Sequence, residues 1–271
     1  IAACRAAPVQ VSFHDPVTSG LKAMDYLITD PVLSPRETKE RFTERLFHLP
    51  TFYVHSPLIN MPCVGLLPAR EKGYVTFGSF NNPSKVNEKV VSLWSRVLHA
   101  VPGSRLTIKY QNIFENESIR QRIVGIFLAY GVEAQRLDLV SASDSSEQHL
   151  ARYDAIDIAL DTFPFTGSTT TFEALWMGVP VITLLGDHMV ARWSGSMLKK
   201  LKLNELVAHD EEEYVNIARG LAQNLAYLES LRVGLRERVA KSPLCDEQGR
   251  TRQIERAYRW MWAKWCAERQ S

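Results

Sequence analysis

The sequence has few cysteines, no long apolar run and almost no net charge. Its 271 residues include four cysteines with neither CxxC nor metal-ligand spacing, so we expect reduced thiols and a cytoplasmic location rather than disulfides or a metal centre. No apolar stretch approaches the roughly 20 residues of a membrane span. A formal net charge of +2 gives no reason to expect nucleic acid or an acidic membrane as a partner.

Several well-known site motifs are also missing. The sequence contains no GxGxxG after its first strand pattern, no GxxxxGK[ST] and no GxSxG. These absences disfavour nicotinamide-type dinucleotide binding, P-loop chemistry and an α/β-hydrolase. The chain opens Ile-Ala-Ala, with neither Met nor a signal peptide, and we expect it to be part of a longer protein.

From Gly73 onward, strand and helix patterns alternate regularly. The expected strands are 74–80, 106–110, 137–140, 156–160, 179–183 and 206–209, and the expected helices are 87–101, 118–130, 147–153, 190–201, 210–224, 228–241 and 252–267. Such alternation predicts an α/β fold with a doubly wound parallel sheet. The last helix carries an aromatic face, which we expect to pack on the protein rather than to bind a ligand.

The first 66 residues lack a clear core pattern of their own. Short strands are expected at 8–13 and 26–29, and one helix near 38–46 interrupts a run punctuated by prolines. We interpret residues 1–69 as the tail of an upstream domain with its connection, and residues 70–271 as the main α/β domain.

The central stretch, residues 155–183, predicts a strand–loop–helix–strand unit with a burst of hydroxyls from Ser168 to Thr171. Ligands of parallel sheets sit at the carboxyl ends of the strands, beside helix N-termini. Two interpretations stay open. Thr170 and Glu173 have the spacing of a capping box that only closes the helix. Alternatively, Ser168, Thr169 and Thr170 hold a diphosphate and Glu173 accepts from a ribose hydroxyl.

A second candidate loop follows the first strand of the α/β domain, where residues 77–85 read FGSFNNPSK. Lys85 is placed to neutralise a diphosphate, and Asn82 to donate to the same oxygens. A solvated surface lysine is the alternative. The two loops lie at the same predicted edge of the sheet, which favours the phosphate interpretation.

These motifs resemble the catalytic region of the O-GlcNAc transferase family, in particular its SPINDLY-type and bacterial branch. The resemblance rests on FGSFNNPSKVN (77–87), His149-x-x-Arg152 and LDTFPFTGSTTTFEALWMGVPVIT (160–183), with APVQV (7–11), TSG (18–20), MDY (24–26) and ITDP (28–31) matching the end of the family's first catalytic lobe. It covers essentially the whole chain.

The resemblance implies a GT-B glycosyltransferase whose Rossmann-like C-terminal lobe holds the sugar nucleotide. It implies inverting, metal-independent transfer of GlcNAc or fucose from UDP-GlcNAc or GDP-fucose to Ser or Thr hydroxyls of an acceptor protein, with no cofactor. Lys85 would be the catalytic cation that stabilises the leaving diphosphate. The implied ligand contacts are Asn82, Lys85, Thr169 and Thr170 to the diphosphate, Glu173 to the ribose, and His149 and Arg152 at the nucleobase. Without the family context, His149 reads as a helix-surface histidine.

The sequence departs from the family in one loop. Relatives carry a W-x-G-Y-P-G-T-S-G-like loop beside the sugar, whereas this chain has His14 for a glycine and Asp15 for an aromatic residue. A nucleotide-binding module that has lost transfer is therefore the alternative function, and a GT-B epimerase is a third. The relatives' tetratricopeptide array and most of the first lobe are expected upstream of these residues.

Overall fold

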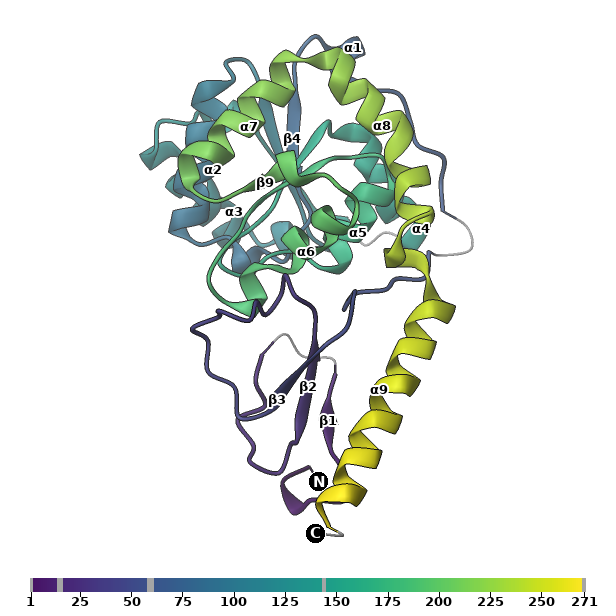
Figure 1. Cartoon of the computed structure of the whole chain (residues 1–271). Helices are drawn as coiled ribbons and strands as arrows, with labels where there is room; N and C mark the ends of the chain where they lie inside the picture. Colours follow the sequence, from purple (N-terminus) through teal and green to yellow (C-terminus); the bar gives the residue numbers. More distant parts are fainter. Residues whose placement is uncertain (1, 14–16, 58–60, 143–144, 270–271) are drawn as a thin grey trace.

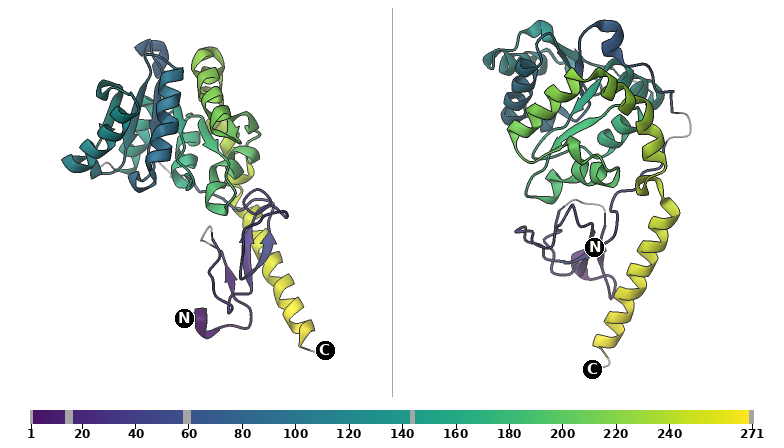
Figure 2. Two further views of the ribbon diagram at one scale, coloured as in Figure 1. Left: turned by 90° about the vertical axis from the view of Figure 1, so that its left-hand side faces the viewer. Right: turned by 45° about the horizontal axis from the view of Figure 1, so that its top comes forward.

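The computed structural model describes residues 2–13, 17–57, 61–142 and 145–269. These residues form a larger lobe around a six-stranded sheet and a smaller one around a three-stranded sheet (Figure 1). Both termini lie at the far end of the smaller lobe, and a long C-terminal helix runs beside it (Figure 2). His14 and Asp15, the two departures from the family loop, lie outside the described residues.

The six-stranded sheet is parallel throughout and has the order β6-β5-β4-β7-β8-β9. Its strands are β4 (Thr76–Ser79), β5 (Arg105–Lys109), β6 (Leu137–Val140), β7 (Ile158–Leu160), β8 (Val181–Leu184) and β9 (Val207–Ala208). The chain first moves outward from β4 to β6 and then returns to continue from β7 on the other side. This order places a topological switch point between β4 and β7, which is where open α/β sheets bind ligands.

Apart from α1, which was not predicted, the helices fall close to the ranges predicted from the sequence. They are α1 (Pro68–Lys72), α2 (Glu88–Ala100), α3 (Glu117–Ala129), α4 (Ser146–Ala151), α5 (Thr169–Trp176), α6 (Trp193–Lys200), α7 (Glu211–Gln223), α8 (Leu225–Ala240) and α9 (Glu247–Glu268). Among the larger lobe's helices, α2 packs against α7, and α5 packs against α8. The predicted α/β class with a parallel sheet is confirmed. No helix in the described ranges has both the length and the apolar character to cross a membrane.

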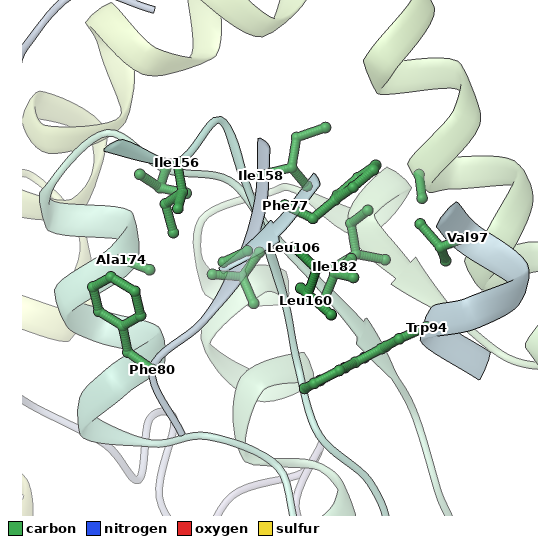
Figure 3. Close-up of a cluster of buried hydrophobic side chains, with 14 of the residues drawn as sticks. Phe77, Phe80, Trp94, Val97, Leu106, Ile156, Ile158, Leu160, Ala174 and Ile182 are labelled. Carbon is green, nitrogen blue, oxygen red and sulfur yellow. The ribbon is translucent and has the colours of Figure 1, made fainter. Parts of the chain in front are cut away.

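The core of the larger lobe fills the space between the sheet and its helices. Trp94 of α2 lies over the sheet beside Leu160 and Ile182, and it is fully buried (Figure 3). Gly78 of β4 permits a close approach, because a Cβ there would lie 2.5 Å from Cδ1 of Ile156. The strands of a parallel sheet that is buried on both faces are typically continuous apolar runs.

The smaller sheet joins β1 (Val11–Ser12), β2 (Tyr26–Thr29) and β3 (Arg45–His48) in that order, all parallel. The helix predicted near 38–46 is wrong, since this segment is irregular and leads into β3. Pairing with β2 gives the backbone of β3 its hydrogen bonds. The carboxylate of Glu44 is held by the amide of Ser19 at 2.6 Å and the hydroxyl of Thr18 at 2.6 Å. These long-range contacts override local helix propensity.

Helix α9 leaves the larger lobe and packs on the smaller sheet. Its Met261 shares a buried cluster with Tyr26 of β2, and its Trp260 ring lies 5.5 Å from Phe47 and 6.1 Å from Tyr26. Part of the aromatic face therefore packs on the protein as predicted, although Trp262 stays half exposed. The division into residues 1–69 and 70–271 stays a prediction, and α9 makes contacts across it.

Candidate functional site

The site lies where β4 and β7 end side by side at the switch point. Asn81 follows β4 and is 6% exposed, and Asp161 follows β7 and is 2% exposed. The Asn81 amide nitrogen lies 3.4 Å from Asp161 Oδ1. A buried amide and a buried carboxylate thus meet at the one edge of the sheet where sequence order reverses. Neither was among the predicted ligand residues.

Asp161 organises the β7–α5 loop, residues 161–168. Its Oδ1 accepts from the amides of Gly167 at 2.7 Å and Thr162 at 3.0 Å, and its Oδ2 accepts from the hydroxyl of Thr183 at 2.8 Å. Burial raises the pKa of Asp161, while hydrogen bonds and the positive charge of Lys85 act against that rise. The loop therefore closes around one carboxylate and delivers the chain to the start of α5 in a fixed position.

The N-terminus of α5 is left open. Ser168 precedes the helix without a capping side chain, and within the described residues no acceptor meets the amides of Thr169, Thr170 and Thr171. The capping-box interpretation is wrong. Thr170 donates its hydroxyl to Asn81 Oδ1 at 3.1 Å, and the Glu173 carboxylate turns toward other side chains. Free N–H groups at a helix N-terminus attract anions.

Lys85 lies beside this open helix end. Its ammonium group donates to the Thr166 carbonyl at 2.9 Å and approaches Asn81 Oδ1 at 3.5 Å, so Asn81 links it to Thr170. The ammonium also lies 4.1 Å from the centroid of the Phe165 ring. Burial lowers the pKa of Lys85, and the Asp161 carboxylate opposes that effect. The surface-lysine alternative does not describe this half-buried, partnered side chain.

Asn82 and Arg152 are placed less directly. The Asn82 side chain accepts from the Ser84 amide at 3.0 Å and so caps the short turn that carries Lys85. Arg152 is exposed where α4 passes into the next turn. Contact of either residue with a ligand stays a prediction.

A cavity of about 610 Å³ opens next to the α5 N-terminus. Four predicted ligand residues line it, namely His149, Thr169, Thr170 and Glu173. The rest of the lining comes from the ends of β4 and β5, the segment after β6, and α4, and includes Phe80, Lys109, Tyr110, Gln111, Asn112, Ala142, Ser146 and Leu150. The cavity therefore adjoins the N-terminus of α5, and Asn81 links Lys85 to the same helix end.

Inside the cavity, His149 and Glu173 face each other across α4 and α5. His149 Nε2 lies 3.2 Å from Glu173 Oε2, and the Tyr153 hydroxyl lies 3.2 Å from the Thr170 carbonyl oxygen and 3.4 Å from Glu173 Oε2. Burial and the charge of Glu173 raise the pKa of Tyr153 well above its usual value. Glu173 Oε1 has no hydrogen-bond partner among the described residues, so it can accept from a ligand. Lys109, which the sequence did not single out, lies 2.7 Å from His149 Nδ1.

The connection between the two lobes also reaches α5. The Tyr53 hydroxyl lies 3.3 Å from Thr169 Oγ1, and the His55 ring contacts the Phe172 ring at 4.3 Å between centroids with a tilt of 33°. Burial raises the pKa of Tyr53 and lowers that of His55. The His55 amide donates to the Leu244 carbonyl at 2.8 Å, so the two chain passages between the lobes touch. Sequence reasoning missed Tyr53 and His55 because their segment has no periodic pattern.

Metal-ligating side chains do not gather in the described ranges, where no group of three or more His, Cys, Asp or Glu could hold an ion. All four cysteines are free. Metal independence of the reaction stays a prediction.

Comparison with known proteins decides the family. The family model described as glycosyl transferase family 41 matches residues 1–61 and 67–254. The chain belongs to this family. A Petunia hybrida protein named "Probable UDP-N-acetylglucosamine--peptide N-acetylglucosaminyltransferase SPINDLY" is 45% identical over 266 residues, which are 97% of this chain and 28% of that protein. The protein of Arabidopsis thaliana with the same name is 42% identical over 97% of this chain and 29% of its own length.

A solved structure supports the same assignment. A lysine-to-methionine mutant of the Thermobaculum terrenum O-GlcNAc transferase matches with a TM-score of 0.87 and 39% identity, over 97% of this chain and 50% of that one. The predicted GT-B type, with a Rossmann-like C-terminal lobe, is thereby confirmed. Sucrose-phosphate synthase from Thermosynechococcus elongatus, at 16% identity and a TM-score of 0.55 over 89% of this chain and 59% of that one, shares the fold alone. The chain spans less than a third of the length of the curated relatives and half of the solved transferase.

Proposed function

We propose that this family 41 chain binds a nucleoside-diphosphate sugar and takes part in transferring GlcNAc or fucose to Ser or Thr hydroxyls of an acceptor protein. The observation that carries the proposal is the open N-terminus of α5, flanked by Lys85 and adjoining a cavity with a free carboxylate oxygen. The SPINDLY-type relatives are named as probable peptide N-acetylglucosaminyltransferases with UDP-N-acetylglucosamine as the donor. The donor UDP-GlcNAc or GDP-fucose would be a substrate, and no cofactor is proposed.

The diphosphate would bind at the α5 N-terminus. The amides of Thr169 and Thr170 offer donors, and the partial positive charge of the helix end favours an anion. Lys85 adds a full positive charge within the same region, and Asn82 is proposed to help through its amide. The Thr169 hydroxyl lies beside the cavity and offers a further donor, whereas the Thr170 hydroxyl donates to Asn81 Oδ1.

The nucleoside would occupy the cavity. Glu173 Oε1 is placed to accept from a ribose hydroxyl, because its other oxygen is already engaged by His149 and Tyr153. The His149 ring would stack on the base, and Arg152 would lie near it. Stacking on an aromatic face works for every base, so these residues leave both uridine and guanosine as candidates.

The proposed reaction is inverting and needs no metal. The acceptor oxygen forms a bond to the anomeric carbon from the face opposite the diphosphate, and the bond from that carbon to the diphosphate oxygen breaks. The negative charge that develops on the leaving group is stabilised by the Lys85 ammonium and by the α5 amides, which are already in place. The base that takes the acceptor proton is not assigned. We further propose that the partner of this reaction is an acceptor protein and that the protein is cytoplasmic. The rest of the first lobe and a tetratricopeptide array are proposed to lie upstream of these residues.

A thermal-shift titration tests the binding part of the proposal. UDP, GDP and ADP are added to the wild type, to Lys85→Ala and to Lys89→Ala, a control that removes an exposed lysine of α2. Binding to the folded state alone stabilises by about 2.7 kcal/mol at 100 times Kd, and about 2 °C per kcal/mol gives a shift of ~5 °C. Loss of a charged hydrogen bond costs about 1.5–3 kcal/mol, so Lys85→Ala should abolish most of the shift.

The outcomes separate the candidate functions. A shift with UDP or GDP that survives Lys89→Ala and is lost in Lys85→Ala supports the site and selects the donor class. Sugar transfer to a peptide by the longer protein, followed by mass spectrometry, then separates a transferase from a binding module without turnover. No shift with any nucleotide would refute the proposed function of these residues.

A further inference from the structure

Lys109 is a buried lysine that the proposed chemistry does not use. It is the last residue of β5, is 3% exposed and lines the cavity with His149 and Glu173. Its Nζ lies 2.7 Å from His149 Nδ1, which is a short distance for a hydrogen bond between two nitrogen atoms. A buried charge is retained in a protein only where it has strong partners, so this contact calls for a physical explanation.

The contact fixes the protonation pattern of the imidazole. An ammonium group has donors only, so His149 Nδ1 must accept and carries no proton. A neutral imidazole then holds its proton on Nε2, which faces Glu173 Oε2 at 3.2 Å and donates to it. We propose that Lys109 is a positioning residue that locks His149 as the neutral Nε2–H tautomer between Lys109 and Glu173.

The surroundings of His149 agree with this assignment. Among the residues that the structure describes, the charged and titratable groups that face it are Lys109 from β5, Glu173 from α5 and Tyr153 from the turn after α4. The ring of Phe80, from the end of β4, lies 5.8 Å away at 51°. Four segments besides its own helix therefore surround the imidazole.

The lock determines what His149 can offer a ligand. Both ring nitrogens are engaged in the plane of the ring, so no hydrogen-bonding group remains for a nucleobase and only the ring face is free to interact. His149 then recognises the flat surface of a base and does not discriminate between bases through hydrogen bonds. The ring lies between the Lys109 ammonium and the Glu173 carboxylate.

The test reads the tautomer directly in the ligand-free protein. The chain has seven histidines, and comparison with His149→Gln assigns the ring nitrogens of His149 in spectra of ¹⁵N-histidine-labelled protein. We expect Nδ1 to resonate as an unprotonated nitrogen and Nε2 as a protonated one in the wild type and in Lys109→Arg, which retains a cationic donor. Lys109→Met, of similar length, should lose this fixed pattern and show exchange between protonation states.

Nucleotide affinity supplies the second measurement, and only this part rests on the proposed function. We expect Lys109→Met to weaken binding of UDP or GDP about tenfold, the effect of losing one hydrogen bond to a charged group, and Lys109→Arg to restore most of it. If the wild type binds no nucleotide, the proposed function fails while the spectra still decide the tautomer. A protonated Nδ1 in the wild type or in Lys109→Arg overturns the inference even if Lys109→Met does not fold. An unchanged tautomer or an unchanged affinity in folded Lys109→Met also overturns it.

Discussion

Replacing Asp161 by alanine and by asparagine separates the hydrogen bonds of this side chain from its charge. The carboxylate accepts from the amides of Gly167 and Thr162 and from the hydroxyl of Thr183 at 2.7–3.0 Å. Alanine leaves these three buried donors without an acceptor, and each orphaned group costs about 1–3 kcal/mol. Allowing for relaxation of the β7–α5 loop, we expect Asp161→Ala to lower the free energy of unfolding by ~4 kcal/mol.

Asparagine keeps nearly all of these contacts. Its Oδ1 can accept from Gly167 and Thr162 as before, and its Nδ2 can donate to Thr183, whose hydroxyl accepts as readily as it donates. We therefore expect Asp161→Asn to change the free energy of unfolding at pH 7 by less than about 1 kcal/mol. In thermal unfolding, at about 2 °C per kcal/mol, we expect the melting temperature of the alanine variant to fall ~8 °C below that of the wild type. The melting temperature of the asparagine variant should stay within ~2 °C of the wild type.

The pH dependence tests the charge. Burial raises the pKa of Asp161 in the folded protein, and a carboxyl with a raised pKa stabilises the fold below its unfolded pKa of about 3.9 and loses that contribution as pH rises through the folded pKa. Urea unfolding from pH 4 to 8 should therefore show the wild type losing stability relative to Asp161→Asn as pH rises. Equal destabilisation by the alanine and asparagine substitutions would refute this reasoning. So would a stability of the wild type, relative to Asp161→Asn, that stays constant or increases as pH rises.

Two further predictions concern packing and thiol chemistry. A Cβ at Gly178, where φ is +76°, would lie 2.5 Å from the backbone oxygen of Arg232, so Gly178→Ala should lower the free energy of unfolding by about 3 kcal/mol. The control Gly220→Ala, with nothing within 4 Å in α7, should stabilise by about 0.5–1 kcal/mol in the same urea titration. Burial raises the pKa of the Cys245 thiol to about 11. In timed alkylation at pH 8, followed by mass spectrometry, Cys245 should be labelled long after exposed Cys4, and equal rates would contradict the burial.

The strands and helices of the larger lobe could be predicted from the sequence because each of them has a recognisable local pattern. Buried parallel strands are short apolar runs, and helices such as α2 carry a cap at Asn87 and a regular apolar face. The helix expected near 38–46 failed for the opposite reason. Its residues are fixed by partners far along the chain, as Glu44 is by Thr18 and Ser19, and no local pattern records such contacts.

The site was predicted in outline but not in detail. The positions of Lys85 and of Thr169 and Thr170 followed from two polar loops at one edge of a sheet. Which of two adjacent asparagines turns inward did not, since Asn81 is the buried one and its neighbour caps a turn. Lys109 fell within the strand expected at 106–110 and was not singled out, and only the folded arrangement places it against His149.

The two chain passages between the lobes lie side by side. One passes through His55 and the other through Leu244, and a backbone hydrogen bond joins them. Further contacts join the lobes beside them, since the Ser196 hydroxyl of α6 donates to Asp30 Oδ2 at 2.6 Å and the Met189 amide donates to Glu40 Oε2 at 2.9 Å. Because Tyr53 and His55 on one passage contact Thr169 and Phe172 of α5, any displacement of that passage would also displace side chains at the helix N-terminus.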